Sequence, residues 1–206
     1  MLRQPVAYQE QARRGFDLVS RRPLTDIYRS HGVRVFEPER LEQSVITKLF
    51  DRQRPTVVHI QAPVVQDTER NFVLDLPLST ENNAAPPVFT AEYLNLLLRS
   101  VRTRNPPLLI LDPPRPADDA DVARQLLLRN RFAADFAEIG NARALLCTGL
   151  FERSGAQLAA ERLALEISLT PRLDQLLLLC RGELGTDRFS GMGAALIVAD
   201  PTELIR

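Results

Sequence analysis

The stretch LLILDPPRP, residues 108–116, decides the fold class of this chain. Its first four residues form a continuous apolar run, which is typical of a central parallel strand covered on both faces. Asp112 and three prolines then end the run. Ligands in open α/β sheets bind at the carboxyl ends of the strands. We therefore look for a site here, although proline carries neither a nucleophile nor a proton acceptor.

Apolar segments on both sides of this strand predict an alternation of strands and helices. Strands are predicted over 33–36, 56–60, 142–150 and 193–199, and helices over 7–19, 38–50, 90–101, 119–138 and 154–169. Thr90 is placed to cap one helix, and the acidic residues from Asp118 to Asp121 are placed to cap another. A polar loop is predicted over 65–89, around an irregular strand at 72–76. The order implies right-handed crossovers and a mostly parallel sheet between helical layers, hence the α/β class.

Length and charge limit the kinds of protein that this chain can be. A chain of 206 residues suits one large domain, here over 31–206, after a polar, arginine-rich extension over 1–30. The 26 basic and 26 acidic side chains cancel, so no global field favours nucleic acid. No apolar segment approaches the roughly 20 residues that span a bilayer, and the first residues do not form a signal peptide. Cys147 and Cys180 lie in apolar runs, which predicts reduced thiols and a cytoplasmic protein.

Three segments together resemble one protein family. They are GVRVFEPERLEQSVITKLFDRQRPTVVHIQAPV (32–64), PPVFTAEYLNLLLRSVRTRNPPLLILDPP (86–114) and RNRFAADFAEIGNARALLCTGL (129–150). In order and spacing they resemble the CHAT-type caspase-like peptidases, of the clan of caspases and separases. In that family a strand of the type VVHFAGHG carries the catalytic histidine, and a segment of the type LSAEEL…LVVLNAC carries the cysteine. The resemblance implies a three-layer α/β/α caspase-like fold from about residue 31 onward.

The same resemblance implies that the catalytic dyad has been lost. His59 matches the first histidine of the family pattern, Pro63 falls at the catalytic histidine and Pro114 falls at the nucleophilic cysteine. Ala62 and Val64 replace the two glycines that flank the catalytic histidine. Proline has no side-chain acceptor and no backbone N–H for an oxyanion hole. Residues 104–120 contain no Cys, Ser, Thr or His that could substitute.

The resemblance therefore implies a catalytically inactive pseudo-peptidase that acts as a protein-binding or regulatory subunit, without a cofactor. Its expected partner is another protein, an active peptidase or a helical-repeat sensor in a bacterial stress or defence assembly, with self-association as an alternative. Asp112 and His59 are the expected groove residues. A leucine-rich run over 173–182 must lie in the core or beneath another chain.

Two further readings of the residues stay open. An enzyme with relocated chemistry could pair Cys147 with His59 as a cysteine hydrolase, or hold Mg²⁺ at the carboxyl edge of the sheet. The candidate acidic ligands are Asp67, Glu69, Asp112, Asp118, Asp119 and Asp121. A lone histidine in an apolar strand is more often a core residue held by one hydrogen bond, and a cysteine in such a strand is more often buried and unreactive. The other reading is a plain α/β interaction module without peptidase ancestry.

Overall fold

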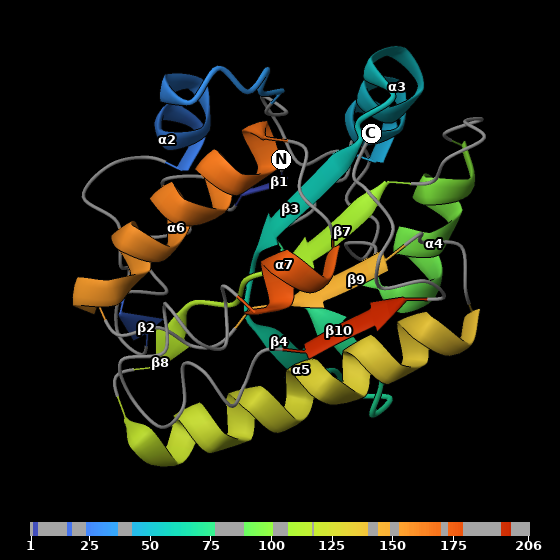
Figure 1. Ribbon diagram of the computed structural model, residues 1–206. Coiled ribbons are helices and arrows are strands. Elements are labelled where there is room, and N and C mark those ends of the chain that lie inside the picture. The colour runs from blue at the N-terminus through green and yellow to red at the C-terminus, as the bar shows by residue number, and fades with distance from the viewer. Residues whose placement is uncertain are drawn as a thin grey trace.

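The computed structural model describes residues 2–3, 16–17, 24–36, 43–76, 89–100, 107–116, 118–139, 144–148, 153–169, 173–178 and 195–198. Over these residues the chain is a mixed α/β protein in which helices pack around a central sheet (Figure 1). The predicted α/β class is therefore confirmed.

The central sheet has five strands in the order β1-β3-β7-β9-β10. They are β1 (Leu2–Arg3), β3 (Val57–Gln61), β7 (Leu108–Leu111), β9 (Ala144–Cys147) and β10 (Ala195–Val198). The first four strands run parallel, and β10 pairs antiparallel with β9. All four residues of β7 are buried, as the uninterrupted apolar run predicts for a strand at the centre of a sheet.

Helices pack on both faces of this sheet. On one face, α3 (Gln43–Gln53), α4 (Ala91–Ser100) and α5 (Asp119–Ile139) share a core with alternate residues of the strands, including Val58, Leu109 and Cys147. On the other face, α2 (Leu24–Ser30) packs against α6 (Arg153–Ser168) (Figure 1). Because strand side chains alternate between faces, residues next to those in the first core, such as His59, point toward α2.

Two small antiparallel elements flank the central sheet. One joins β4 (Val64–Gln66), β5 (Phe72–Leu74) and β6 (Phe89–Thr90), and the other pairs β2 (Phe16–Asp17) with β8 (Arg115–Pro116). The strand predicted at 72–76 is confirmed as β5, but the predicted polar loop over 65–89 is wrong where β4 and β5 form a hairpin, and 77–88 lie outside the described residues. The helix predicted over 7–19 is wrong at Phe16–Asp17, and its other positions are not described.

Two local predictions about helix starts are confirmed. The Tyr93 backbone N–H donates to Thr90 Oγ1 at 3.1 Å, and the Ala120 N–H donates to Asp118 Oδ1 at 2.8 Å. These side-chain acceptors satisfy backbone donors that have no partner within the helix. The strand predicted at 33–36 is wrong, because this segment pairs with no strand among the described residues.

The N-terminal and C-terminal parts of the chain both add helices around the sheet. Residues 24–30, assigned from the sequence to a polar extension, form α2 and bury Leu24 and Ile27. The leucine-rich run forms α7 (Leu173–Leu178), in which Leu176 is buried and Leu178 is 66% exposed; Cys180 lies outside the described residues. None of the helices in the described ranges is both long and apolar enough for a bilayer span.

Candidate functional site at the carboxyl edge of the sheet

Polar side chains gather where three adjacent parallel strands end. Gln61 is the last residue of β3, Asp112 directly follows β7 and Thr148 directly follows β9. The register pairs Ile60 with Leu111 and Leu111 with Cys147. Gln61, Asp112 and Thr148 each directly follow one of these residues, so the three polar side chains lie next to one another across the sheet. They project to the face opposite the α4–α5 core, which is also the face of His59.

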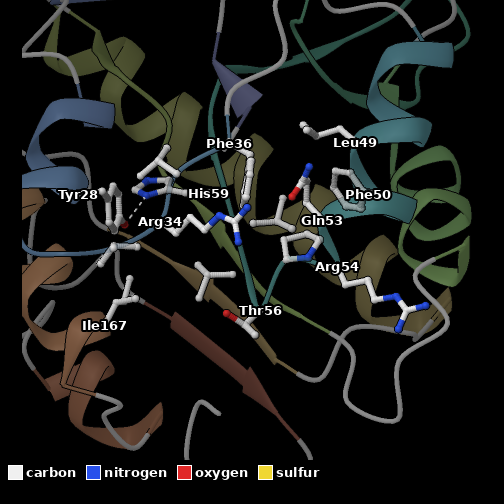
Figure 2. Close-up of a pocket in the computed structure, with 15 residues that line it drawn as sticks. Tyr28, Arg34, Phe36, Leu49, Phe50, Gln53, Arg54, Thr56, His59 and Ile167 are labelled. Carbon is white, nitrogen blue, oxygen red and sulfur yellow. Dashed lines mark hydrogen bonds between the residues drawn. The ribbon is translucent and has the colours of Figure 1, made fainter.

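His59 also borders a pocket, together with Tyr28 of α2 (Figure 2). The pocket has a volume of about 280 Å³ and lies beside the first half of β3, against the end of α3, residues 33–36 and Ile167 of α6. His59 itself is almost fully buried, with 3% of its side chain exposed. It therefore stands between this pocket and the polar edge of the sheet.

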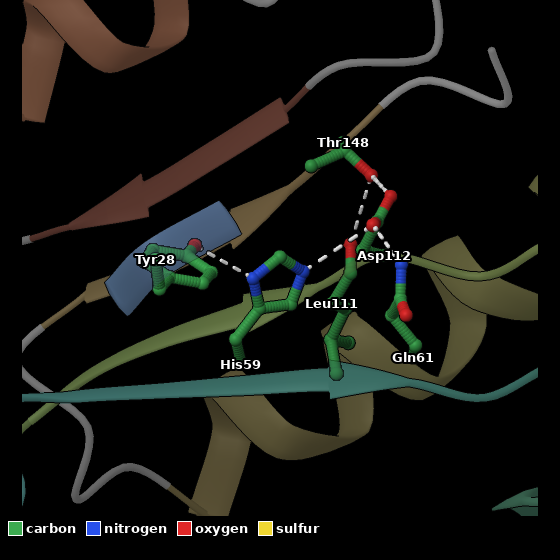
Figure 3. A network of polar contacts seen from close by, with 6 residues as sticks. All are labelled: Tyr28, His59, Gln61, Leu111, Asp112 and Thr148. Carbon is green, nitrogen blue, oxygen red and sulfur yellow. Dashed lines mark hydrogen bonds and ion pairs between the residues drawn. The ribbon is translucent and has the colours of Figure 1, made fainter. Parts of the chain in front are cut away.

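Asp112 is the acceptor at the centre of the polar cluster (Figure 3). Its Oδ2 lies 3.3 Å from His59 Nε2 and accepts from Gln61 Nε2 at 3.0 Å. Its Oδ1 accepts from Thr148 Oγ1 at 2.5 Å, and its backbone N–H donates to the Ile60 carbonyl at 2.9 Å. Three side chains from neighbouring strands therefore converge on one carboxylate.

These contacts decide the charge of Asp112. Burial alone would raise the pKa of its carboxyl group, but the interaction with His59 and the hydrogen bonds from Thr148 and Gln61 outweigh burial and lower that pKa below its ordinary value. Asp112 is consequently ionised near neutral pH. An ionised carboxylate can only accept, so His59 Nε2–H donates to it.

The other ring nitrogen of His59 faces Tyr28. The Tyr28 hydroxyl lies 2.8 Å from His59 Nδ1, and the two rings meet edge to face with centroids 5.8 Å apart. Hydrogen bonds therefore link Tyr28 through His59 to Asp112, and both ring nitrogens of His59 have partners. This is one more partner than the single hydrogen bond expected of a core histidine.

A buried arginine supports the same edge from the opposite face. Arg129 of α5 is fully buried and donates through Nη1 to the backbone carbonyl of Thr148. Burial lowers the pKa of Arg129, while the nearby Cys147 and Asp112 act in the opposite direction. Arg129 thus ties α5 to the end of β9 and adds a positive charge near Asp112.

The structure separates Cys147 from His59. Cys147 belongs to the core beneath α5, on β9, whereas His59 points to the α2 face from β3, and β7 lies between the two strands. Burial raises the pKa of the Cys147 thiol, and Arg129 offsets this only in part. A thiol that is buried and protonated is a poor nucleophile. The geometry therefore does not favour a Cys147–His59 hydrolase.

The acidic residues weighed as magnesium ligands are dispersed. Asp67 accepts from the backbone N–H groups of Glu69 and Asn71 in the β4–β5 turn, and Asp118 caps α5. Asp119 pairs with Arg115 at 3.0 Å, while Asp112 is held by His59. Over the ranges that the structure describes, no three His, Cys, Asp or Glu side chains gather in a way that could hold a metal ion.

Pro63 and Pro114 lie beyond the ends of adjacent strands. Pro63 is the second residue after β3, and Pro114 is the third residue after β7. Both prolines therefore follow the carboxyl ends of adjacent parallel strands, and beyond them the chain enters two different small sheets, through β4 after Pro63 and through β8 after Pro114. Pro63 is buried and Pro114 is partly buried.

Sequence reasoning found some of these residues and missed others. His59 and Asp112 were both expected in a groove, and they contact each other. Tyr28, Gln61 and Thr148 were missed. Gln61 could have been found, because it is polar and directly follows the strand predicted over 56–60, whereas Thr148 lies inside the strand predicted over 142–150 and marks its end only in the structure. Comparisons of the chain with protein-family models, curated proteins and solved structures gave no match.

Proposed function

We propose that this chain is a catalytically inactive caspase-like domain, with three layers of the CHAT type, that works in the cytoplasm by binding another protein. The observation that carries the proposal is that Pro63 and Pro114 each lie within three residues of the carboxyl end of one of two adjacent parallel strands, β3 and β7. This is the placement that the family resemblance requires of the degenerate catalytic positions. If the two prolines followed strands at opposite ends of the sheet, they could not correspond to the catalytic positions of the family.

The chemistry of this edge supports binding rather than catalysis. The groups that could move protons, His59 and Asp112, are bonded to each other and to neighbouring side chains, and His59 has almost no exposed surface. General acid–base catalysis needs a group within reach of the substrate proton, and nucleophilic catalysis needs an activated nucleophile. Neither stands at Pro63 or Pro114. The hydrogen-bond network holds the ends of β3, β7 and β9 in place, and the proposed binding of a partner protein involves the residues that follow these strands.

The first experiment tests whether Pro63 and Pro114 border one groove, as the family resemblance requires. A variant with both Pro63→His and Pro114→Cys rebuilds the family dyad, and Pro114→Cys alone is its matched control. If the two positions flank one groove, the histidine lowers the pKa of the new thiol, so the double variant reacts faster with iodoacetamide at neutral pH. Equal rates in the two variants would refute the shared groove. Circular dichroism of both variants, compared with the unmodified chain, establishes that they are folded.

The second experiment tests the binding role. The tagged chain is used to capture proteins from its own source cells, in parallel with Pro114→Arg and with Ala123→Arg, which adds the same side chain to an exposed position of α5. We expect one stoichiometric protein partner that is retained by the unmodified chain and by Ala123→Arg and lost with Pro114→Arg. Hydrolysis of peptides by the unmodified chain, or equal retention by both variants, would contradict the proposal.

A further inference from the structure

We propose that the pocket beside the first half of β3 binds a small amphipathic carboxylate, with an apolar body and a single negative charge. The site is separate from the sheet edge that carries the proposed function, and it goes beyond that function. Its volume, about 280 Å³, lies at the small end of the range for ligand sites, so it suits one aromatic ring or a short acyl chain.

The walls of the pocket are apolar and only partly buried. Phe36, Leu49, Val57 and Ile167 all line it, and each keeps part of its surface exposed. They come from four separate parts of the fold: the segment after α2, then α3, β3 and α6. Side chains of this type are normally covered, and together they offer an apolar surface that a ligand body would remove from water.

The charge of the pocket is one-sided. Arg34 and Arg54 line it, and none of the described lining residues is acidic. Within the described ranges, neither arginine forms an ion pair. In Figure 2 Arg34 lies in the middle of the lining residues, with its guanidinium 4.7 Å from the centre of the Phe36 ring, while Arg54 points away from the rim. An unpaired guanidinium held over an aromatic face is prepared to bind a carboxylate through two parallel hydrogen bonds.

The backbone at the rim is fixed where α3 ends. Arg54 follows the last residue of α3 and has φ 45°, a left-handed conformation that glycine adopts most readily. Its N–H donates to the Phe50 carbonyl at 3.0 Å and so closes the helix. Because the Arg54 side chain points away from the pocket, Arg34 is the cation that a bound carboxylate would meet.

The polar end of the pocket favours a single charge. The Tyr28 hydroxyl is already hydrogen-bonded to His59, so it does not add a free donor for a second negative charge. Gln53 and Thr56 supply neutral polar groups beside Arg34. A carboxylate needs one guanidinium, whereas a phosphate monoester carries nearly two charges and calls for more donors. We therefore assign the ligand to the carboxylates.

Calorimetric titration of the full chain tests this assignment with defined compounds. The probes are 3-phenylpropanoate and octanoate. Three controls accompany them: 3-phenylpropanamide has the same apolar part but no charge, acetate has the carboxylate but almost no apolar part, and benzyl phosphate carries nearly two negative charges. We expect one or both amphipathic carboxylates to bind in the micromolar to millimolar range, and the amide, acetate and benzyl phosphate to bind at least about tenfold more weakly.

Two variants then locate the site. Arg34→Gln should weaken carboxylate binding about tenfold or more, whereas Arg131→Gln, which removes the same charge from an exposed position on α5, should not. Ile167→Trp should fill the pocket and abolish binding while thermal unfolding shows a folded protein. No binding by either carboxylate, equal binding of acid and amide, or unchanged binding by Arg34→Gln would overturn the proposal. None of these results depends on the protein partner.

Discussion

His59 and Asp112 join the two central strands of the sheet through their side chains, with Nε2 of the imidazole 3.3 Å from Oδ2 of the carboxylate. The imidazole is nearly buried and the carboxylate is 18% exposed. Tyr28, Gln61 and Thr148 complete this pair, so a change at any one of the five residues removes at least one hydrogen bond from the network.

Asp112→Asn should destabilise the fold, and the effect should depend on pH. The amide removes the charge and presents N–H groups to donors, so we expect a loss of about 1–3 kcal/mol near neutral pH. The folded-state pKa of Asp112 is lowered, so its contribution is complete above the unfolded pKa of about 3.9 and is lost as the pH falls toward the folded value. Urea unfolding across the acid range should show the difference from the unmodified chain shrinking. A difference that stays constant with pH would contradict this account.

Tyr28→Phe should be destabilising, whereas Tyr93→Phe should not. The first change leaves His59 Nδ1 buried without its hydrogen-bond partner, which we expect to cost about 1–3 kcal/mol. The Tyr93 hydroxyl is buried and has no hydrogen-bond partner among the described residues, and burial raises the pKa of Tyr93 to about 12. Removing that hydroxyl should be neutral or stabilising. Equal losses in the two variants, measured by urea unfolding, would show that the Tyr28–His59 bond is not the cause.

Arg54→Gly should raise stability. Glycine relieves the left-handed strain at the end of α3, which we expect to be worth up to about 1 kcal/mol. Arg52→Gly is the control, because Arg52 lies within α3, where glycine should cost about 1 kcal/mol. Thermal unfolding compares the two. A loss of stability in Arg54→Gly would mean that the arginine side chain itself stabilises the helix end.

Cys147 should resist labelling while the protein is folded. Its thiol is buried and its pKa is raised by that burial, so the thiolate fraction near neutral pH is small. We expect alkylation at Cys147, followed by peptide mass mapping to separate it from Cys180, to proceed only in denaturant. Rapid labelling of Cys147 in the native protein would revive the cysteine-hydrolase alternative.

The parts of the fold that follow from local pattern could be predicted, and those that depend on distant contacts could not. β7 is recognisable because a fully buried strand leaves a continuous apolar run, and Thr90 because a helix start needs a side-chain acceptor. The segment 33–36 has the apolar residues of a strand, but those residues line a pocket instead. The spacing of apolar residues cannot show whether a segment pairs with a strand or lines a pocket, because both environments bury the same side chains.

In the candidate site, too, some residues could be predicted from local sequence and others depend on contacts that are distant in the chain. Asp112 could be expected at a site, because it ends a central strand. Tyr28 could not, because its partner His59 is 31 residues away and the helix that carries it is only seven residues long. Asp67 and Asp112 look alike in the sequence, yet one closes a turn and the other accepts from three side chains at the ends of the two neighbouring strands, β3 and β9. Only the register of the sheet separates the two roles.

The bonds around Asp112 also bear on the order in which the chain folds. They connect residues 53, 51 and 36 positions apart, through His59, Gln61 and Thr148. Contacts of such long range form only after the entropy of closing the intervening loops has been overcome. The network therefore becomes complete only when β3, β7 and β9 have all paired, so protection of its exchangeable protons would mark the last step of assembly of the sheet.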